Sequence, residues 1–131
     1  MDISIQEYEQ IMKDWLAAWN RSNPVDVSSF YHDELEYRDP TVPGGIFLKA
    51  KLIIYLKMLF RKWPEQEWKD SNIMPHKENG LFSATYSFRI GNGKKSVQGV
   101  GMDLIEFNGE KIVRNYVYLN SDQWPEWIKN L

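Results

Sequence analysis

The feature that most constrains the fold is a period-two alternation of apolar and polar residues in the second half of the chain. Between Phe82 and Ile90 every second residue is apolar. Asn-Gly or Gly-Asn-Gly turn signals at residues 79–80, 91–93 and 108–109 interrupt the alternation. The pattern predicts an antiparallel meander in which each strand buries one face. Its four strands are expected near residues 66–77, 81–90, 95–107 and 111–119.

The first half of the chain carries helical periodicity instead. Ser4 and Glu7 form a capping box, and apolar residues then recur at helical spacing as far as Trp19. Pro64 ends a second long run of this kind. The elements expected outside the meander are helices near residues 5–19, 25–31 and 47–63, a short strand at 35–39 and a last short helix at 122–129.

Helices followed by a long meander predict an α+β domain in which the helices cover one face of a curved antiparallel sheet. A sheet that wraps around the long helix forms a cone, whose closed end is core and whose open end is a hydrophobic pocket. Six Trp, seven Tyr and six Phe residues can supply aromatic walls for such a pocket. The length of 131 residues and the lack of internal repeats predict a single domain over residues 1–131.

Composition argues against several classes of function. A formal net charge of -2 argues against nucleic-acid binding, which needs a clearly basic surface. The absence of cysteine excludes thiol chemistry, and with two histidines we expect no metal site and no cofactor. The first residues lack a signal-peptide pattern, and the longest apolar run, Leu52 to Leu56, is too short to span a bilayer. We therefore expect a cytoplasmic protein that does not bind membranes.

Asp39 is the first candidate catalytic residue. The alternation of the strand expected at 35–39 places its side chain on the same face as Leu35 and Tyr37, and Pro40 then turns the chain. A carboxylate at the rim of an apolar interior suits the role of a general base. The alternative is structural, because an aspartate before proline commonly starts a turn and accepts hydrogen bonds from its own backbone.

Asp103 is the second candidate, because aspartate is disfavoured inside a strand. It shares a strand face with Gly99 and Gly101, which leave empty volume beside the carboxyl group or mark a bulge, and either arrangement suits a ligand. The alternative is an acid at a sheet edge, or one paired with Arg89 or Arg114. Together the two candidates form an acid–base pair in different environments.

The two acids lie at characteristic places in the order of elements. Asp39-Pro40 follows two helices and a strand and precedes a long helix, and Met102-Asp103 precedes the turn at 108–109 and the last strand. This order resembles the nuclear transport factor 2 superfamily, within it the ketosteroid isomerases and SnoaL-like polyketide cyclases, and implies a cystatin-like cone over nearly the whole chain. In ketosteroid isomerases the acid matching Asp39 shuttles the proton, and the acid matching Asp103 stays protonated and donates to the enolate oxygen.

The resemblance also bears on substrate binding. Trp15 stands where the isomerases carry their oxyanion-hole tyrosine, and an indole N–H donates a hydrogen bond but is a poor proton source. Asn115 is expected to face inward, as a pocket group or alternatively as a satisfied structural amide. Aromatic walls suit a small apolar or aromatic molecule. The expected substrate-binding residues are Trp15, Trp19, Tyr31, Tyr37, Tyr55, Trp63, Phe88 and Asn115.

Three functions fit these observations. The first is a cofactor-independent enzyme of the isomerase or cyclase type that moves a proton beside a carbonyl group. The second is a non-catalytic binder of an apolar metabolite. The third is a protein-interaction module that docks through the sheet or through the basic residues between Lys49 and Lys62, although these residues are alternatively a solvated helix face. Tyr116 and Tyr118 point away from the pocket, and the resemblance implies a homodimer through that side of the sheet.

Overall fold

The computed structural model describes residues 2–121, so the helix expected at residues 122–129 lies outside the described part. The helices of this part are α1 (Ile5–Asn20), α2 (Pro24–Ser28) and α3 (Lys49–Lys62). Its strands are β1 (Tyr31–Arg38), β2 (Ile46–Leu48), β3 (Glu65–Pro75), β4 (Leu81–Gly91), β5 (Ser96–Asn108) and β6 (Lys111–Asn120). None of these helices has the length and apolar character needed to cross a membrane.

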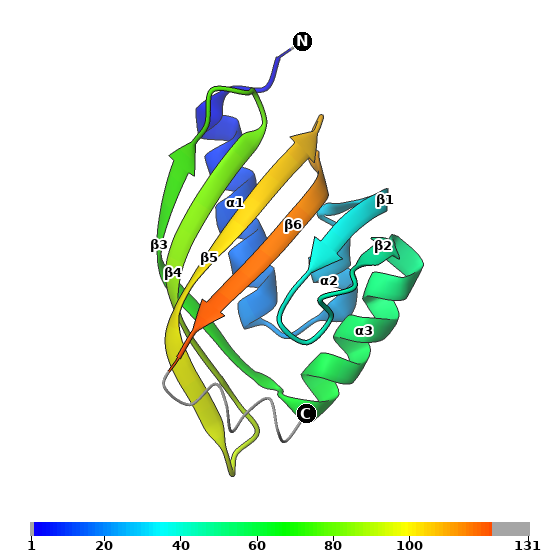
Figure 1. The fold of residues 1–131 in the computed structure, drawn as a ribbon, viewed down its shortest axis with the longest axis vertical. Helices are drawn as coiled ribbons and strands as arrows, with labels where there is room; N and C mark the ends of the chain where they lie inside the picture. The colour runs from blue at the N-terminus through cyan, green and yellow to red at the C-terminus, as the bar shows by residue number, and fades with distance from the viewer. Residues whose placement is uncertain (1, 122–131) are drawn as a thin grey trace.

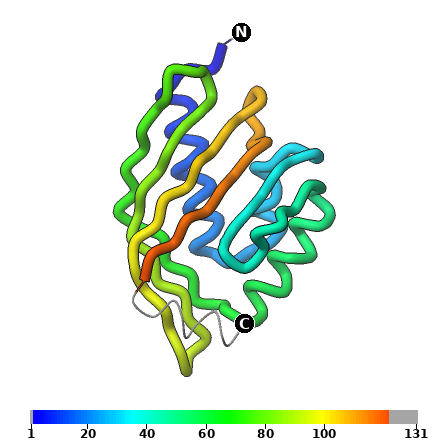
Figure 2. The backbone as a smooth tube through the Cα atoms, in the orientation of Figure 1, coloured from blue at the N-terminus to red at the C-terminus, as the bar shows by residue number. Residues whose placement is uncertain are grey.

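One curved sheet organises the molecule. Its strand order is β2-β1-β6-β5-β4-β3, and the predicted meander of β3 to β6 is antiparallel throughout. β1 joins this meander in parallel with β6. The helices gather on one side of the sheet, with α1 behind the meander and α3 beside β1 and β2 (Figure 1). The backbone trace in Figure 2 shows the same two layers. The predicted α+β fold with a curved sheet is confirmed.

Local sequence explains the main elements. The Ser4 hydroxyl oxygen accepts a hydrogen bond from the N–H of Glu7 at 3.1 Å, so the predicted capping box begins α1. Gly80 and Gly109 take positive φ angles of 85° and 61° in two of the hairpin turns, a conformation that favours glycine. The alternate residues of β4 from Phe82 to Ile90 are buried, as the alternation predicts. The core therefore lies between this inner face and the helices.

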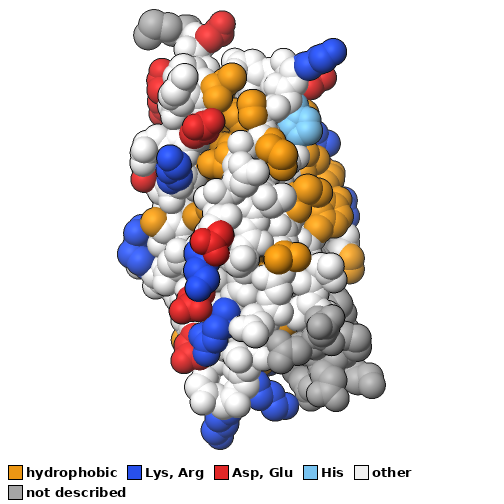
Figure 3. Space-filling view, turned by 90° about the vertical axis from the view of Figure 1, so that its left-hand side faces the viewer, with side chains coloured by type: hydrophobic (Ala, Val, Ile, Leu, Met, Phe, Trp, Pro, Cys, Tyr) orange, Lys and Arg blue, Asp and Glu red, His pale blue; other side chains and the backbone are white. Residues whose placement is uncertain are grey.

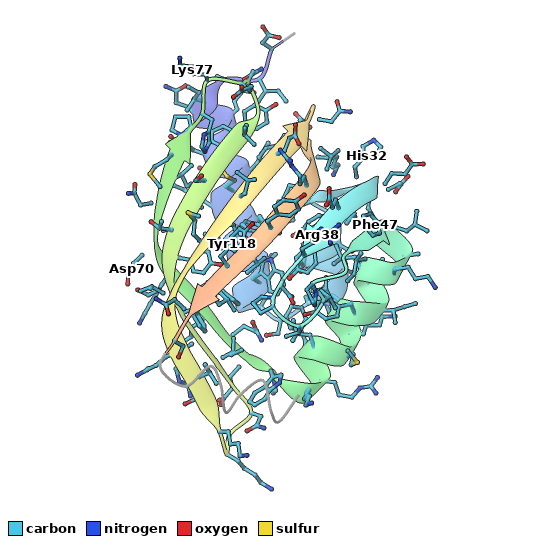
Figure 4. All side chains as sticks on the ribbon, viewed as in Figure 1. His32, Arg38, Phe47, Asp70, Lys77 and Tyr118 are labelled. Atoms are coloured by element: carbon cyan, nitrogen blue, oxygen red, sulfur yellow. The ribbon has the colours of Figure 1, made fainter. Side chains whose placement is uncertain are left out.

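The outer face of the sheet is partly apolar. Val100, Met102 and Tyr118 are exposed there, and Figure 4 shows Tyr118 on the near side of β6. Figure 3 shows hydrophobic side chains in the upper middle of the view and along its right-hand side. Tyr116 is half-buried and donates its hydroxyl to Glu36 at 2.7 Å. The homodimer expected through this face stays a prediction.

The segment before α3 differs from the expectation of one long helix. Residues 46–48 form β2, which pairs with β1, and α3 begins only at Lys49. Gly45 allows this return, because its φ of 92° turns the chain back toward β1. Tyr31 likewise begins β1 instead of ending the second helix, since it pairs with Ile112 of β6. Strand pairing overrides helical periodicity at both places.

Candidate functional site

A small cavity lies among α1, α3 and the inner face of the sheet. Its volume of about 40 Å³ is room for roughly three water molecules. Residues 39–41, which follow β1, form part of its wall. The expected site residues that line it are Asp39, Asp103, Trp15, Trp19, Tyr37 and Tyr55. The structure therefore brings both candidate acids to one cavity.

Asp39 accepts five hydrogen bonds at the end of β1. Its Oδ1 accepts from the N–H and the hydroxyl of Thr41, each at 2.7 Å, and from the N–H of Val42 at 3.1 Å. Its Oδ2 accepts from the hydroxyls of Tyr37 at 2.7 Å and Tyr55 at 2.6 Å. The backbone bonds are those of the structural alternative, whereas both tyrosines line the cavity. One oxygen thus holds the turn and the other lies toward the cavity.

The two tyrosines beside Asp39 are fixed hydroxyl donors. Burial raises the pKa of Tyr37 and of Tyr55 well above the usual tyrosine value, and the charge of Asp39 raises both further. Their rings lie 5.9 Å apart between centroids, and the Tyr55 hydroxyl also lies 2.7 Å from the hydroxyl of Thr41. Both phenols therefore stay protonated across the physiological pH range.

Asp103 lies in the middle of β5 and is only 2% exposed. Its Oδ1 accepts a hydrogen bond from the hydroxyl of Tyr86 at 2.5 Å, and its Oδ2 accepts one from the amide of Asn115 at 3.0 Å. Burial raises the pKa of Asp103 from 3.8 to about 7, against the lowering effect of these two hydrogen bonds. The charge of Asp39 raises the pKa slightly further. This carboxyl group therefore exchanges a proton near neutral pH.

The alternative partners of Asp103 are occupied elsewhere. Arg89 pairs with Glu65 at 3.4 Å, and Arg114 pairs with Glu106 at 3.0 Å. The structural alternative in which one of these arginines pairs with Asp103 is therefore wrong. The groups that hold the acid are instead a neutral phenol and a neutral amide.

The glycines near Asp103 leave no empty volume, and β4 and β5 pair without a bulge at this point, so both sequence-based expectations for them are wrong. A Cβ on Gly101 would lie 2.5 Å from the ring of Tyr86 and 2.9 Å from the side chain of Leu119. A Cβ on Gly99 would collide with the backbone of a neighbouring strand. The ring that fills the space at Gly101 is the one whose hydroxyl reaches Asp103.

A chain of hydrogen bonds runs from Asp103 to α1. Asn115, which donates to Asp103, accepts from the hydroxyl of Tyr31 at 2.7 Å, and that hydroxyl accepts from the indole N–H of Trp15 at 3.2 Å. Tyr31 and Asn115 are fully buried behind the cavity wall and do not line it. The ring of Trp15 faces the cavity, but its N–H is committed to Tyr31.

Trp63 and Phe88 were also expected to bind substrate, and neither lines the cavity. Both belong to a second apolar cluster with Tyr86, Ile90 and Val97. Phe88 stacks on Trp68 with the ring centroids 5.6 Å apart, and Trp68 is the ring that lines the cavity. Phe88 therefore supports the wall from behind.

Sequence analysis missed Thr41, Gln66, Trp68 and Tyr86, all of which line the cavity. The alternation of β4 places Tyr86 on the inner face, where its hydroxyl needs a partner. A glycine opposite a tyrosine is the signal that could have found it, since Tyr86 pairs across the strands with Gly101. Gln66 and Trp68 carry no such signal, because β3 does not alternate clearly.

The lining offers carboxyl, hydroxyl and amide groups. Within residues 2–121, no three His, Asp or Glu side chains converge where they could hold a metal ion. The chemistry that these groups can perform is proton exchange and hydrogen bonding. Asp103 supplies a proton-exchanging group near neutral pH, and the phenols supply donors that stay protonated.

Comparisons with known proteins agree with this fold. The family model described as the SnoaL-like domain matches residues 12–115. A candidate polyketide cyclase from Xanthomonas campestris pv. campestris has a TM-score of 0.78 at 16% identity, over 95% of this chain and 96% of that one. The epoxide hydrolase/cyclase-like enzyme SalBIII, from pyran ring formation in the polyether salinomycin, has a TM-score of 0.77 at 12% identity, over 88% of this chain and 92% of that one. No curated protein sequence matches this chain.

Proposed function

The chain belongs to the SnoaL-like domain family, and from this premise we propose that its cavity, together with the adjoining groove, binds a small ring compound and that the cavity groups move a proton at the carbon beside a carbonyl group. The observation that carries the proposal is that Asp39 and Asp103 line one cavity in opposite settings. Asp39 accepts five hydrogen bonds, whereas Asp103 is buried between two neutral partners. Two carboxyl groups in such different environments can act as acid and base together.

In this reaction Asp103 acts on the carbonyl oxygen. With a pKa of about 7, a large share of Asp103 is neutral at or just below neutral pH. A neutral carboxylic acid donates a hydrogen bond to the oxygen on which negative charge develops as the proton leaves carbon. Tyr86 binds Oδ1 of Asp103 and lines the cavity, so the acid is held in place before the substrate arrives.

Asp39 takes the proton from carbon in the same step. Its cavity-side oxygen is bound by Tyr37 and Tyr55, so one of these phenols must release it. Thr41 offers the second acceptor that this release needs, because its hydroxyl lies 2.7 Å from the hydroxyl of Tyr55. A small rotation of the Tyr55 hydroxyl then frees Oδ2 of Asp39 without leaving the phenol unpaired.

The proposal is tested by hydrogen–deuterium exchange beside the carbonyl group in a panel of cyclic ketones, measured by NMR. We expect Asp39→Asn to lower kcat/KM by about 100-fold or more, because an amide cannot accept the proton. Glu110→Gln removes the same charge from an exposed turn and should leave the rate unchanged. An unchanged rate in Asp39→Asn would show that Asp39 is not the base.

A non-catalytic binder of an apolar metabolite is the second candidate. The five hydrogen bonds at Asp39 favour it, because a carboxylate with every acceptor position occupied serves the turn without reacting. Mass spectrometry of ligand retained through purification distinguishes the two roles. Ligand retained by the wild type and by the double variant Asp39→Asn Asp103→Asn, with no turnover in either, supports the binder.

A further inference from the structure

In the part of the chain that the structure describes, the ionisable lining of the cavity includes acids and no bases. Asp39 and Asp103 line it, and none of its lining residues within the described chain is Lys, Arg or His. Arg38, the sequence neighbour of Asp39, pairs with Glu36 at 2.8 Å and lies 5.6 Å from the ring of Phe47, beside it in Figure 4. Across residues 2–121, neither cavity acid has a cation within ion-pair distance.

An unpaired acid inside a protein is energetically costly in its charged form. Asp103 is in this situation, because it is buried without a cation from the described part of the chain, and burial raises its pKa to about 7 although two hydrogen bonds favour the charged form. A positive charge placed beside this carboxyl group would offset the cost. The electrostatics of the cavity wall are therefore complementary to a cation.

Aromatic rings surround the same space. Trp15, Trp19, Trp68, Tyr37, Tyr55 and Tyr86 all line the cavity. Neighbouring rings pack closely, with centroids 5.2 Å apart for Trp68 and Tyr86 and 5.8 Å apart for Trp19 and Trp68. The faces of such rings carry negative electrostatic potential and attract ammonium groups, most strongly where water is excluded. The rings and the carboxyl groups thus favour the same kind of ligand.

The volume of the cavity limits which part of a ligand can enter it. The cavity of about 40 Å³ takes a head group of a few heavy atoms. Asp39, Pro40, Val117 and Leu119 line both this cavity and a groove of about 580 Å³ on the outer side. Because these four residues line both spaces, the groove is the nearest room for the rest of a ligand.

Going beyond the proposed function, we propose that the same cavity also binds a ligand that carries a protonated nitrogen on an apolar frame with a ring, in the state in which Asp103 is charged and the proton-transfer reaction, which needs Asp103 neutral, does not run. The ammonium group lies among the aromatic faces and the two acids, and the frame extends past Pro40 and Leu119. Carboxylates, fatty acids and phosphates are disfavoured, because they would meet two acids in the cavity, and Arg38, which lines the groove, is paired with Glu36.

Three compounds that share one ring test the proposal: benzylammonium, benzyl alcohol and benzoate. Binding at about pH 8, where Asp103 is mostly charged, is followed by tryptophan fluorescence and ligand-observed NMR. We expect benzylammonium to bind about tenfold or more tightly than benzyl alcohol, and benzoate not to bind. Equal affinities for the ammonium and the alcohol, tighter binding of benzoate, or no binding of benzylammonium overturns the proposal.

Substitution of each acid tests whether the two acids cause the preference for benzylammonium over benzyl alcohol. Asp39→Asn and Asp103→Asn should each lower the affinity for benzylammonium several-fold and leave that for benzyl alcohol within about twofold. The control Glu110→Gln changes net charge equally at an exposed turn and should not alter the preference. An equal loss in this control would assign the preference to net charge and contradict the proposal. If Asp103→Asn does not fold, the wild-type series and Asp39→Asn decide.

The two proposals fail in different ways. Failure of the proton-transfer function appears as absent exchange in the ketone panel. Failure of the ligand class appears in the binding series, which needs no turnover.

Discussion

The cavity wall holds two aspartates in different ways. Asp39 follows β1, where the chain leaves the sheet, and two backbone N–H groups of the following turn are free to bind it. Asp103 lies inside β5, whose backbone pairs with β4 on one side and β6 on the other. Only side chains can bind a carboxyl group there. Strand pairing therefore determines how many backbone donors each acid receives.

The largest effect expected from this difference is on stability against pH. The pKa of Asp103 is raised from 3.8 to about 7 in the folded chain. Between these two pH values the folded state therefore holds a proton that the unfolded state has lost. This proton on Asp103 stabilises the folded state in full below about pH 4, and the contribution is lost as pH rises through 7. The difference between the folded and unfolded pKa values of Asp103 corresponds to roughly 4 kcal/mol in the free energy of unfolding.

Asp103→Asn removes this dependence. We expect the free energy of unfolding of the variant, relative to the wild type, to improve by roughly 4 kcal/mol between about pH 4 and pH 8. Urea unfolding at a series of pH values measures it. Parallel pH profiles for the two proteins would show that Asp103 has an ordinary pKa.

A smaller effect on stability tests the packing of the side chains around Asp103. Gly101→Ala should lower the free energy of unfolding by about 2 kcal/mol, because the added Cβ forces the ring of Tyr86 away from Asp103. Gly44→Ala is the matched control, since a Cβ there meets nothing within 4 Å. Thermal unfolding of both variants measures the difference, and equal shifts would contradict the packing described.

Tyr86→Phe tests the hydrogen bond itself. Its loss should cost about 1.5 kcal/mol above pH 7, where Asp103 is charged, and less near pH 5. It should also raise the pKa of Asp103, because this bond lowers it. Tyr8→Phe serves as the control, since Tyr8 donates to the neutral carbonyl of Gly109 and its loss should cost the same at both pH values. Unfolding experiments at the two pH values decide between these outcomes.

The smallest effect on stability is expected at Asp39, in the turn that follows β1. Asn also forms turns of the Asp39 type, so Asp39→Asn should lower the free energy of unfolding by less than about 1 kcal/mol. The same change is expected to lower kcat/KM for proton transfer by about 100-fold or more, which separates the turn role of this side chain from its chemical role. Chemical denaturation beside the exchange assay measures both. A loss of several kcal/mol would mean that the phenols depend on the charge for folding.

Much of the fold was predictable because its signals are local. The alternation of β4 and the Asn-Gly turns specify the meander, and the capping box specifies the start of α1. The short strand at 46–48 was not predictable, because it exists only through its pairing with β1 across the turn at Gly45. Likewise, only the parallel contact with β6 makes Tyr31 a strand residue.

The site was predictable in part for the same reason. Alternation placed Asp39 and Asp103 on inward faces, and both line the cavity. Which aromatic rings border the cavity depends on contacts between distant strands, so Phe88 was expected at a wall that Trp68 occupies. The partner of Asp103 was missed because Tyr86 reads as an ordinary member of an apolar strand face.

The most direct test of this account is the titration of the Asp103 carboxyl carbon by 13C NMR, with Asp103→Asn used to assign the signal. The account predicts a midpoint at about pH 7. A midpoint near 3.8, the ordinary value, would contradict it, because Asp103 would then be charged throughout the neutral range and could not donate to a substrate oxygen.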